Sequence, residues 1–330
     1  MQEPGGTPLE RLAALMHGDM LQVNALIVEN MQSEVKLIPQ LAGYLIASGG
    51  KRIRPLLTLA CTSLFGGDMS RTHGLAASVE FIHTATLLHD DVVDGSKERR
   101  GKDAANLVFG NQASVLVGDF LFSRAFQLMV AGGSLEVLRI LSDAAATISQ
   151  GEVKQLTTAN NLDTSMDDYI EVVSAKTAAL FAAACEIGPV IAEQDSETQE
   201  SLRLYGLNLG IAFQIVDDVL DYNADHAKLG KTIGDDFREG KMTAPILLAL
   251  ANADNEERAF WQRTVGDRQQ NEDDLAHAME LLQKHGAIAK GLDLAKTYGR
   301  KAQQALTAAP DGDLRRLLDD IVSFTIEREY

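Results

Sequence analysis

The stretch HTATLLHDDVVDGSKERRG, residues 83–101, places three carboxylates, Asp90, Asp91 and Asp94, at the end of an otherwise apolar segment. In a helix these side chains lie within about one turn of each other, so their charges repel. The C-terminus of a helix also carries the negative end of the backbone dipole, which disfavours anions. A hard divalent cation relieves both effects. Mg²⁺ fits best, because it takes one or two carboxylates and completes its shell with water and substrate phosphate oxygens.

An isolated acidic cluster of this spacing is more often a solvated helix end, but here the same spacing returns later in the chain. Residues 210–222, GIAFQIVDDVLDY, carry Asp217, Asp218 and Asp221, and Gln214 stands one turn earlier. On a helix these four side chains form one polar face among apolar residues. Because buried polar groups need partners, we expect the two acidic helices to face each other and form a metal-binding rim of six carboxylates.

The composition predicts one soluble, all-α domain. The chain has 330 residues, 45% of them hydrophobic, only seven prolines and no Pro/Gly/Ser-rich linker. Many Ala/Leu stretches and few β-branched alternations favour helix nearly throughout. Residues 1–8 are predicted to be a loose N-terminal segment and 9–330 a single helical domain. Helices are expected over about 9–31, 36–48, 55–65, 70–94, 103–131 and 134–158. Another is expected to begin at a cap at Ser165 and to extend past Ile187, and others to contain the second acidic cluster and to begin near Pro245. The last three are expected over about 272–285, 287–308 and 312–327.

Charge and cysteine content narrow the function classes. The 47 acidic residues outnumber the 30 basic ones, for a net charge of −17, so we expect no nucleic-acid binding. Cys61 and Cys185 both lie in apolar surroundings and are predicted to be buried thiols in a reducing compartment, with no disulfide. The longest apolar stretch, 177–192, is too short and interrupted to span a bilayer. We therefore predict a cytoplasmic protein without a transmembrane segment.

Basic residues stand out against this acidic background. Lys51, Arg52 and Arg54 directly precede Pro55, which is predicted to open a helix, and a helix N-terminus preceded by cations is a ready phosphate site. Arg99 and Arg100 follow the first acidic cluster. Short basic runs are usually solvated, but both of these flank predicted helices near the expected acidic rim, which indicates an anionic ligand.

At this point the chain resembles the trans-type (E-) polyprenyl diphosphate synthases of the long-chain bacterial group, which make octaprenyl, nonaprenyl or decaprenyl diphosphate. The matching pieces occur in the family's order and cover most of residues 30–325. They are GGKRIRP (49–55), VEFIHTATLLHDDVVD (79–94), RRG (99–101), FGNQASVLVGDFLFSRAF (109–126), GEVKQL (151–156), AKTAALFAAACEIG (175–188), FQIVDDVLDY (213–222) and LGKTIGDDFREGKMTAPILLAL (229–250).

The resemblance implies the isoprenoid synthase fold, a helical bundle around a central cavity, and a Mg²⁺-dependent condensation of isopentenyl diphosphate onto farnesyl or geranylgeranyl diphosphate. It implies more than one Mg²⁺ per site, a homodimer, and a product delivered to the membrane for quinone side chains. The residues it assigns to isopentenyl diphosphate are Lys51, Arg54, His83 and Arg100. Those it assigns to the allylic diphosphate are Arg99, Lys176, Thr177, Gln214 and Lys231. Asp90, Asp94, Asp217, Lys176 and Lys231 act in the ionisation step, and Asp90, Asp91, Asp94, Asp217, Asp218 and Asp221 form the metal set. His89 is interpreted as structural, and Asp91, turned about 100° from Asp90, as the weaker ligand of the first cluster.

Product length is expected to depend on the pocket below the first acidic cluster. Ala85 and Thr86, five and four residues before Asp90, are small, whereas bulky aromatic residues there would stop growth early. The sequence therefore predicts a deep tunnel, with Phe126 or Met129 as its floor.

Three other functions compete with this one. A terpene cyclase usually has a different second metal motif and needs no site for a second diphosphate. A metal-dependent phosphohydrolase using His83, His89 and Asp90 leaves the second cluster unexplained. A non-catalytic subunit of a heteromeric synthase tends to lose one acidic cluster, and this chain keeps both.

Overall fold

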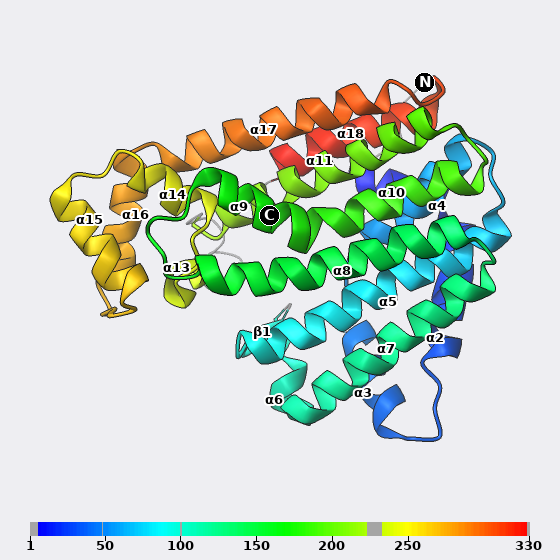
Figure 1. Ribbon diagram of the computed structural model, residues 1–330, viewed down its shortest axis with the longest axis horizontal. Coiled ribbons are helices and arrows are strands. Elements are labelled where there is room, and N and C mark those ends of the chain that lie inside the picture. The colour runs from blue at the N-terminus through cyan, green and yellow to red at the C-terminus, as the bar shows by residue number, and fades with distance from the viewer. Residues whose placement is uncertain (1–5, 48, 100, 223–232, 329–330) are drawn as a thin grey trace. The chain divides into compact units, whose positions relative to one another are not determined.

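The computed structural model describes residues 6–47, 49–99, 101–222 and 233–328, and they are almost entirely helical (Figure 1). Within these ranges the only strands are β1 (Glu98–Arg99) and β2 (Lys102–Asp103), an antiparallel pair that the sequence did not predict. Glu98 lies opposite Asp103, and Arg99 opposite Lys102. The prediction of an all-α protein is confirmed.

The chain forms two compact units, each assembled from separate stretches of sequence. The first contains residues 1–145, 183–203 and 307–318, and the second contains 146–182, 204–306 and 319–330. Each unit is described by itself below. The single domain expected over 9–330 stays a prediction.

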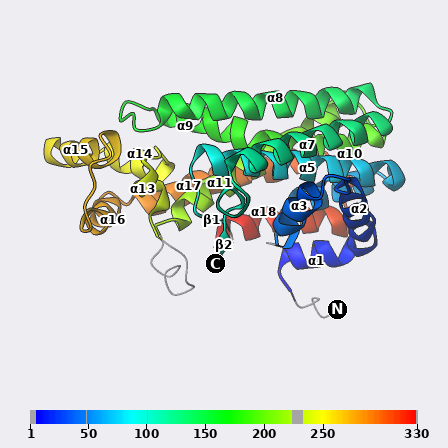
Figure 2. The ribbon, with the colours of Figure 1, turned by 90° about the horizontal axis from the view of Figure 1, so that it is seen from below.

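In the first unit the long helices α5 and α7 lie side by side (Figures 1 and 2), and α2 and α4 also pack on α5. The helix expected over 9–31 is interrupted at Met16, and the one expected over 103–131 at Gly110, whose φ of 86° is readily adopted only by glycine. The helices that belong wholly to this unit are α1 (Pro8–Leu15), α2 (His17–Asn30), α3 (Leu37–Ala47), α4 (Ile53–Leu64), α5 (Met69–Val93), α6 (Ala105–Phe109) and α7 (Asn111–Ala131).

The second unit contains a π-helical turn, η1, between two α-helices. Ser165 caps α9 through a capping box with Asp168, as predicted, and the helical path then continues through η1 into α10. Two short helices, α13 and α15, were not predicted. The elements wholly in this unit are α9 (Met166–Val173), η1 (Ser174–Ala178), α13 (Asp235–Glu239), α14 (Ala244–Leu250), α15 (Asn255–Trp261), η2 (Gln262–Gly266, also π-helical), α16 (Asp274–Lys284) and α17 (Ala287–Leu306). The helices with residues in both units are α8 (Leu135–Thr158), α10 (Ala179–Ile191), α11 (Ser196–Leu220) and α18 (Asp313–Glu327).

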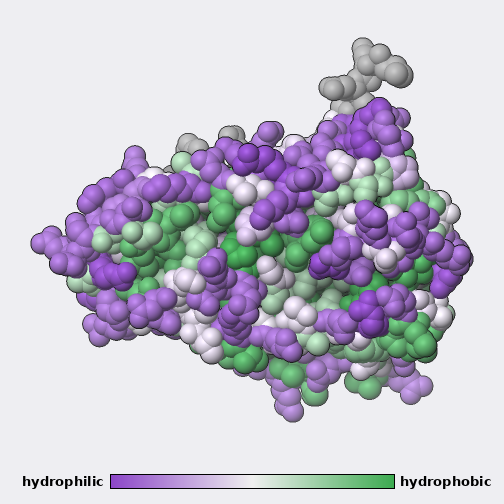
Figure 3. All heavy atoms as spheres, turned by 45° about the horizontal axis from the view of Figure 1, so that its top comes forward, coloured by the Kyte–Doolittle hydropathy of each residue, from purple (hydrophilic) through white to green (hydrophobic). Residues whose placement is uncertain are grey.

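Hydrophilic side chains cover most of the face shown in Figure 3, with smaller hydrophobic areas between them. Helix α7 is long and apolar enough to cross a membrane by length and composition, and a third of its most apolar window is buried. A single helix of this kind is weak evidence for a span, because core helices of soluble proteins have the same length and composition.

Glycine and cysteine determine how closely α4 and α10 pack in the first unit. A Cβ added to Gly188 would lie 2.5 Å from the carbonyl carbon of Cys61, so only glycine permits this approach. Cys61 and Cys185 are fully buried free thiols, which confirms the prediction of buried thiols. Burial raises the pKa of the Cys185 thiol well above its usual value.

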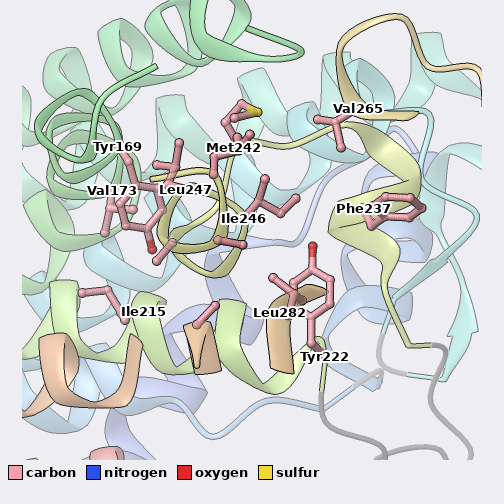
Figure 4. Packing of buried hydrophobic residues seen from close by; sticks show 14 of the residues in the cluster. Tyr169, Val173, Ile215, Tyr222, Phe237, Met242, Ile246, Leu247, Val265 and Leu282 are labelled. Atoms are coloured by element: carbon pink, nitrogen blue, oxygen red, sulfur yellow. The ribbon is translucent and has the colours of Figure 1, made fainter. Parts of the chain in front are cut away.

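The core of the second unit is a cluster of aliphatic and aromatic side chains from α9, η1, α11 and α13 to α17, including η2 (Figure 4). Phe237 and Trp261 meet edge to face at 6.2 Å within it. Two tyrosines, Tyr169 and Tyr222, carry hydroxyl groups into this apolar environment. Their presence in the core brings polar groups close to the second acidic cluster.

Candidate active site

The three aspartates of the first cluster differ in exposure at the end of α5. Asp90 is half-buried, Asp91 is fully buried, and Asp94 is the exposed C-cap residue of the helix. The backbone N–H of Asp94 donates to the carbonyl of Asp90 at 2.8 Å, which continues the helical pattern by one residue. Asp90 and Asp94 therefore remain accessible to a ligand, whereas Asp91 points into the protein.

Asp91 is paired with Arg99 of β1. The guanidinium donates from Nε at 2.7 Å and from Nη2 at 2.6 Å to Oδ1 of Asp91. The second oxygen, Oδ2, is buried and has no hydrogen-bond partner within the part of the chain that the structure describes. Asn106 holds the same corner together, because its side-chain amide donates to the carbonyl of Asp91 at 3.0 Å and to that of Ser96 at 3.2 Å. The predicted roles of Asp91 in metal binding and of Arg99 in diphosphate binding stay predictions, and the structure gives both residues a role in fixing the strand pair to α5.

The first basic run lies at the N-terminus of α4. Lys51 is exposed, and Arg52, the N-cap residue, adopts a left-handed φ of 49°. Arg52 forms an ion pair of 3.1 Å with Glu80 of α5, three residues before His83. Arg54 lies in the first turn of α4, which begins at Ile53, two residues earlier than predicted. Within the first unit the run is thus tied to the helix that carries the first acidic cluster, while Arg100 lies outside the described residues.

His89 packs between α5 and α7. Its Nε2 lies 3.1 Å from the carbonyl oxygen of Val115, and a Cβ added to Gly118 would lie 2.2 Å from the same nitrogen. The ring also stacks on Phe122. These are the contacts of a packing residue, in keeping with the structural interpretation of His89.

The residues expected to set product length lie on α5 and α7 of the first unit. Ala85 is fully buried, and the Thr86 hydroxyl donates to the carbonyl of His83 at 2.8 Å. Of the two candidates for the tunnel floor, Met129 is 1% exposed and Phe126 is 40% exposed. Met129 is therefore the better candidate for an internal floor.

The second acidic cluster contains a hydrogen-bonded network centred on Asp218. The hydroxyl of Tyr169 donates to Oδ2 at 2.6 Å, and the amide of Gln214 donates to Oδ1 at 2.7 Å. Gln214 in turn accepts from the hydroxyl of Thr177 at 2.9 Å. Burial raises the pKa of Asp218 to about 7, and the two donors oppose this by stabilising the carboxylate. Both Asp218 oxygens thus have protein partners, and its predicted role as a metal ligand stays a prediction.

Asp221 lies one residue past the end of α11 and is tied to α13. Its Oδ1 accepts from the backbone N–H of Asp235 at 3.2 Å, and its Oδ2 accepts from that of Asp236 at 3.1 Å. Burial raises the pKa of Asp221 to about 6 and that of Asp236 well above its usual value. The side chain of Asp217 is more open, with 41% of its surface exposed.

A pocket in the second unit contains the network and two lysines. It holds about 670 Å³ of empty space, part of it open to solvent. Lys176 donates to Oε2 of Glu152 at 2.9 Å, and Lys241 lies 4.0 Å from Oδ1 of Asp236. The polar residues of the pocket wall include Tyr169, Lys176, Thr177, Gln214, Asp218 and Lys241. Cations and donors that meet in one pocket suit an anionic, phosphate-bearing ligand.

Local backbone geometry places Lys176 and Thr177 in this pocket. Both lie in the π-turn η1, a feature that often occurs at functional sites. A Cβ added to Gly151 of α8 would lie 2.7 Å from Cβ of Ala175 and 2.9 Å from N of Lys176, so glycine allows α8 to pack directly on η1. The predicted diphosphate ligands Lys176, Thr177 and Gln214 are therefore brought together, whereas Lys231 lies outside the described residues.

Two residues of this site were not assigned from the sequence. Lys241 lines the pocket, and its place in the segment GKMTAP, shortly after the second acidic cluster, was a usable signal. Arg328, near the end of the chain, forms an ion pair with Asp217. An arginine just past the helix predicted over 312–327 gave no signal of this contact.

The carboxylates suit Mg²⁺ chemically, because it prefers oxygen ligands and binds through one or two carboxylates. Across residues 6–47, 49–99, 101–222 and 233–328, no three histidine, cysteine or acidic side chains already stand together as a metal site. Asp90, Asp94 and Asp217 have the exposure that such a ligand needs, while Asp91 is buried against Arg99. In each unit these exposed carboxylates fit a cation that brings much of its own shell as water and phosphate.

Comparison with known proteins agrees with this geometry. Residues 35–282 match the family described as polyprenyl synthetase. The chain is 43% identical to octaprenyl diphosphate synthase of Escherichia coli, over 97% of this chain and 99% of that protein. It superposes on a decaprenyl diphosphate synthase from Rhodobacter capsulatus with a TM-score of 0.93 and 50% identity, covering 97% of this chain and 100% of the other. A polyprenyl synthase from Caulobacter crescentus, solved with calcium and isoprenyl diphosphate, gives a TM-score of 0.94 and 52% identity, with 99% of each chain covered.

Proposed function

Because the chain belongs to the polyprenyl synthetase family, we propose that it condenses isopentenyl diphosphate repeatedly onto farnesyl or geranylgeranyl diphosphate. It is a prenyltransferase of the long-chain type, like the octaprenyl and decaprenyl synthases that it matches over nearly its whole length. Its product is an all-trans polyprenyl diphosphate. The observation that carries the proposal is the pocket in which Lys176, Lys241 and the Thr177–Gln214 pair lie beside Asp218.

This pocket suits the allylic diphosphate, whose carbon–oxygen bond must break. Lys176 and Lys241 supply positive charge, and Thr177 and Gln214 supply hydrogen-bonding groups for the diphosphate oxygens. Magnesium, on which the family depends, adds charge that stabilises the diphosphate as it leaves. We assign its binding to Asp90, Asp94, Asp217 and Asp221, with more than one ion per site.

The second substrate needs binding without bond cleavage. We assign the diphosphate of isopentenyl diphosphate to Lys51, Arg54, His83 and Arg100, a set of basic side chains that includes no carboxylate. Its alkene attacks the allylic cation left by ionisation, and the released diphosphate accepts the proton that is then lost. An apolar wall protects the cation from water. We assign this role to Val172 and Val173, which line the pocket of the second unit.

Homodimer formation and a cytoplasmic location belong to the same proposal. Helix α7 and the neighbouring α6 leave large apolar side chains exposed, among them Leu107, Leu116 and Val130. Exposed apolar residues grouped on neighbouring helices are typical of an interface, and a second copy of this chain would cover them. Light scattering after size-exclusion chromatography tests this, and a monomer at micromolar concentration would contradict it. Delivery of the product to the membrane for quinone side chains follows from a product of this length.

The decisive experiment is an incubation of the purified protein alone with Mg²⁺, labelled isopentenyl diphosphate and farnesyl diphosphate. The product is dephosphorylated and sized by reversed-phase chromatography, and we expect an octaprenyl to decaprenyl alcohol. A cyclic hydrocarbon would instead indicate a terpene cyclase, and phosphate release without chain growth a phosphohydrolase. No consumption of isopentenyl diphosphate would indicate a non-catalytic subunit.

A double-mutant cycle tests whether both acidic clusters act on one diphosphate. Asp90→Asn and Asp217→Asn should each reduce turnover at least a hundredfold, and the double variant should lose little more, because residues that act as a unit are strongly non-additive. Losses that multiply in the double variant would show that the clusters act independently. Circular dichroism of each variant checks that the fold is retained.

A further inference from the structure

Arg328 is a buried cation that reaches the second acidic cluster from the end of the chain. It lies one residue past α18, and its side chain is only 4% exposed. Its Nη2 donates to Oδ1 of Asp217 and, at 2.9 Å, to the carbonyl oxygen of Phe213. The guanidinium also lies 4.0 Å from the centre of the Phe213 ring. All of these groups belong to the second unit.

Such a position is costly for a cation unless its charge is balanced. A buried charge loses its hydration, and the loss is offset only by an opposite charge with good geometry and by further hydrogen bonds. Asp217 supplies the carboxylate, the Phe213 carbonyl supplies an acceptor, and the ring supplies a cation–π contact. Arg328 is therefore held in one place beside a carboxylate that is itself open to solvent.

We propose that Arg328 is a positioning residue that acts through Asp217, serving as its internal counterion and opposing the binding of a divalent cation there. This inference rests on the proposed role of Asp217 as a metal ligand. A cation bound to Asp217 is repelled by the guanidinium on the same carboxylate. The ion pair thus lowers the affinity of the substrate-free enzyme for the metal, and a metal that arrives with a diphosphate, whose negative charge offsets the arginine, is favoured.

The expected effect follows from Coulomb's law. A 2+ and a 1+ charge roughly 5 Å apart repel strongly enough, even at the dielectric constant of water, to change a binding constant about tenfold. A neutral residue at position 328 should therefore tighten metal binding by about tenfold or more. Arg328→Lys keeps the charge and should restore an affinity close to that of the wild type, although it lacks the planar fork of arginine.

The test measures direct binding of Mn²⁺ to the substrate-free protein. Electron paramagnetic resonance reports the concentration of the ion that stays free. The neutral variants are Arg328→Gln and Arg328→Met, the latter keeping an apolar stem against the Phe213 ring. Arg316→Gln is the matched control, because Arg316 is an exposed arginine of α18 that pairs with Asp313, so it removes the same charge elsewhere. Thermal unfolding shows which variants are folded, and two neutral variants keep the test available if one is not.

Tighter Mn²⁺ binding in the folded neutral variants, with Arg328→Lys and Arg316→Gln within about twofold of the wild type, supports the proposal. Unchanged or weaker binding in the neutral variants overturns it, as does equal tightening in Arg316→Gln, which would show an effect of net charge alone. Asp217→Asn separates this result from the proposed function. If that variant binds Mn²⁺ with the affinity of the wild type, Asp217 is not a metal ligand. The metal-binding role that the proposed function gives to the second acidic cluster is then wrong. If Asp217→Asn weakens binding but the neutral variants do not tighten it, only the role of Arg328 is wrong.

Discussion

Gly210→Ala should destabilise the protein, although alanine is the better helix former. Gly206 and Gly210 lie one turn apart on α11 and face η1 and α10. A Cβ added to Gly210 would lie 2.6 Å from Cα and 2.9 Å from Cβ of Ala178. The first of these contacts is with backbone, so no side-chain rotation can relieve it, and the helices must move apart.

The size of the effect follows from two opposing terms. Replacing a helical glycine with alanine stabilises by about 1 kcal/mol, while overpacking a well-packed interior costs roughly 1–3 kcal/mol and more where backbone must shift. We expect a net loss of about 2 kcal/mol in the free energy of unfolding. Separation of α11 from η1 should also lengthen the 2.9 Å hydrogen bond between Thr177 and Gln214 and weaken binding of the allylic diphosphate.

Urea unfolding followed by circular dichroism at 222 nm measures the stability, and the KM for the allylic substrate measures the second effect. The matched control is Gly74→Ala in α5, where an added Cβ meets nothing within 4 Å. This control should stabilise by about 0.5–1 kcal/mol. If Gly210→Ala proves as stable as Gly74→Ala, the close packing of α11 on η1 is not what requires glycine.

Other substitutions probe different parts of the molecule. Hydrogen bonds from its lysine and histidine partners lower the pKa of Glu257 to about 2. The ionised side chain therefore stabilises the fold at pH values above the unfolded-state pKa of 4.5, and this contribution is lost as the pH falls toward 2. Glu257→Gln should therefore lower the free energy of unfolding by about 1–2 kcal/mol at pH 7, a figure that is reduced because the lysine partner is exposed. The difference in urea midpoint between the wild type and this variant should become smaller between pH 5 and pH 3. A difference that does not change with pH would contradict this. Tyr169→Phe removes a donor from the buried Asp218 and should cost about 2 kcal/mol, against almost nothing for Tyr298→Phe, as measured by the same unfolding assay. Ala85→Phe should shorten the product on reversed-phase chromatography, and an unchanged length would refute the tunnel hypothesis.

Helix content and most helix positions were predictable because they depend on local pattern. The segments around 36–48, 70–94, 134–158 and 312–327 were placed within a few residues, and the capping box at Ser165 was identified from its spacing. The errors occur where one residue decides the backbone. Gly110, at φ 86°, divides a segment whose apolar pattern runs on across it.

The sequence supplied candidate residues for the site, but not what each one contacts. Thr177, Lys176 and Gln214 were identified from sequence resemblance, and the structure brings them together in one unit. The Tyr169–Asp218 hydrogen bond joins residues 49 positions apart, and Arg328 contacts a residue 111 positions away. Pairings over such distances depend on tertiary packing, and a single sequence carries no periodic signal for them.

In both acidic clusters the middle aspartate is anchored inside its own unit: Asp91 by Arg99, and Asp218 by Tyr169 and Gln214. The three aspartates of a motif therefore have different surroundings: the carboxylates of Asp91, Asp218 and Asp221 are held by protein groups, whereas Asp94 and the side chain of Asp217 are more exposed. An inactive Asp91 or Asp218 variant would say little about cation chemistry until its folding had been measured. Kinetic surveys that rank all six acids on one scale would mix two different kinds of damage.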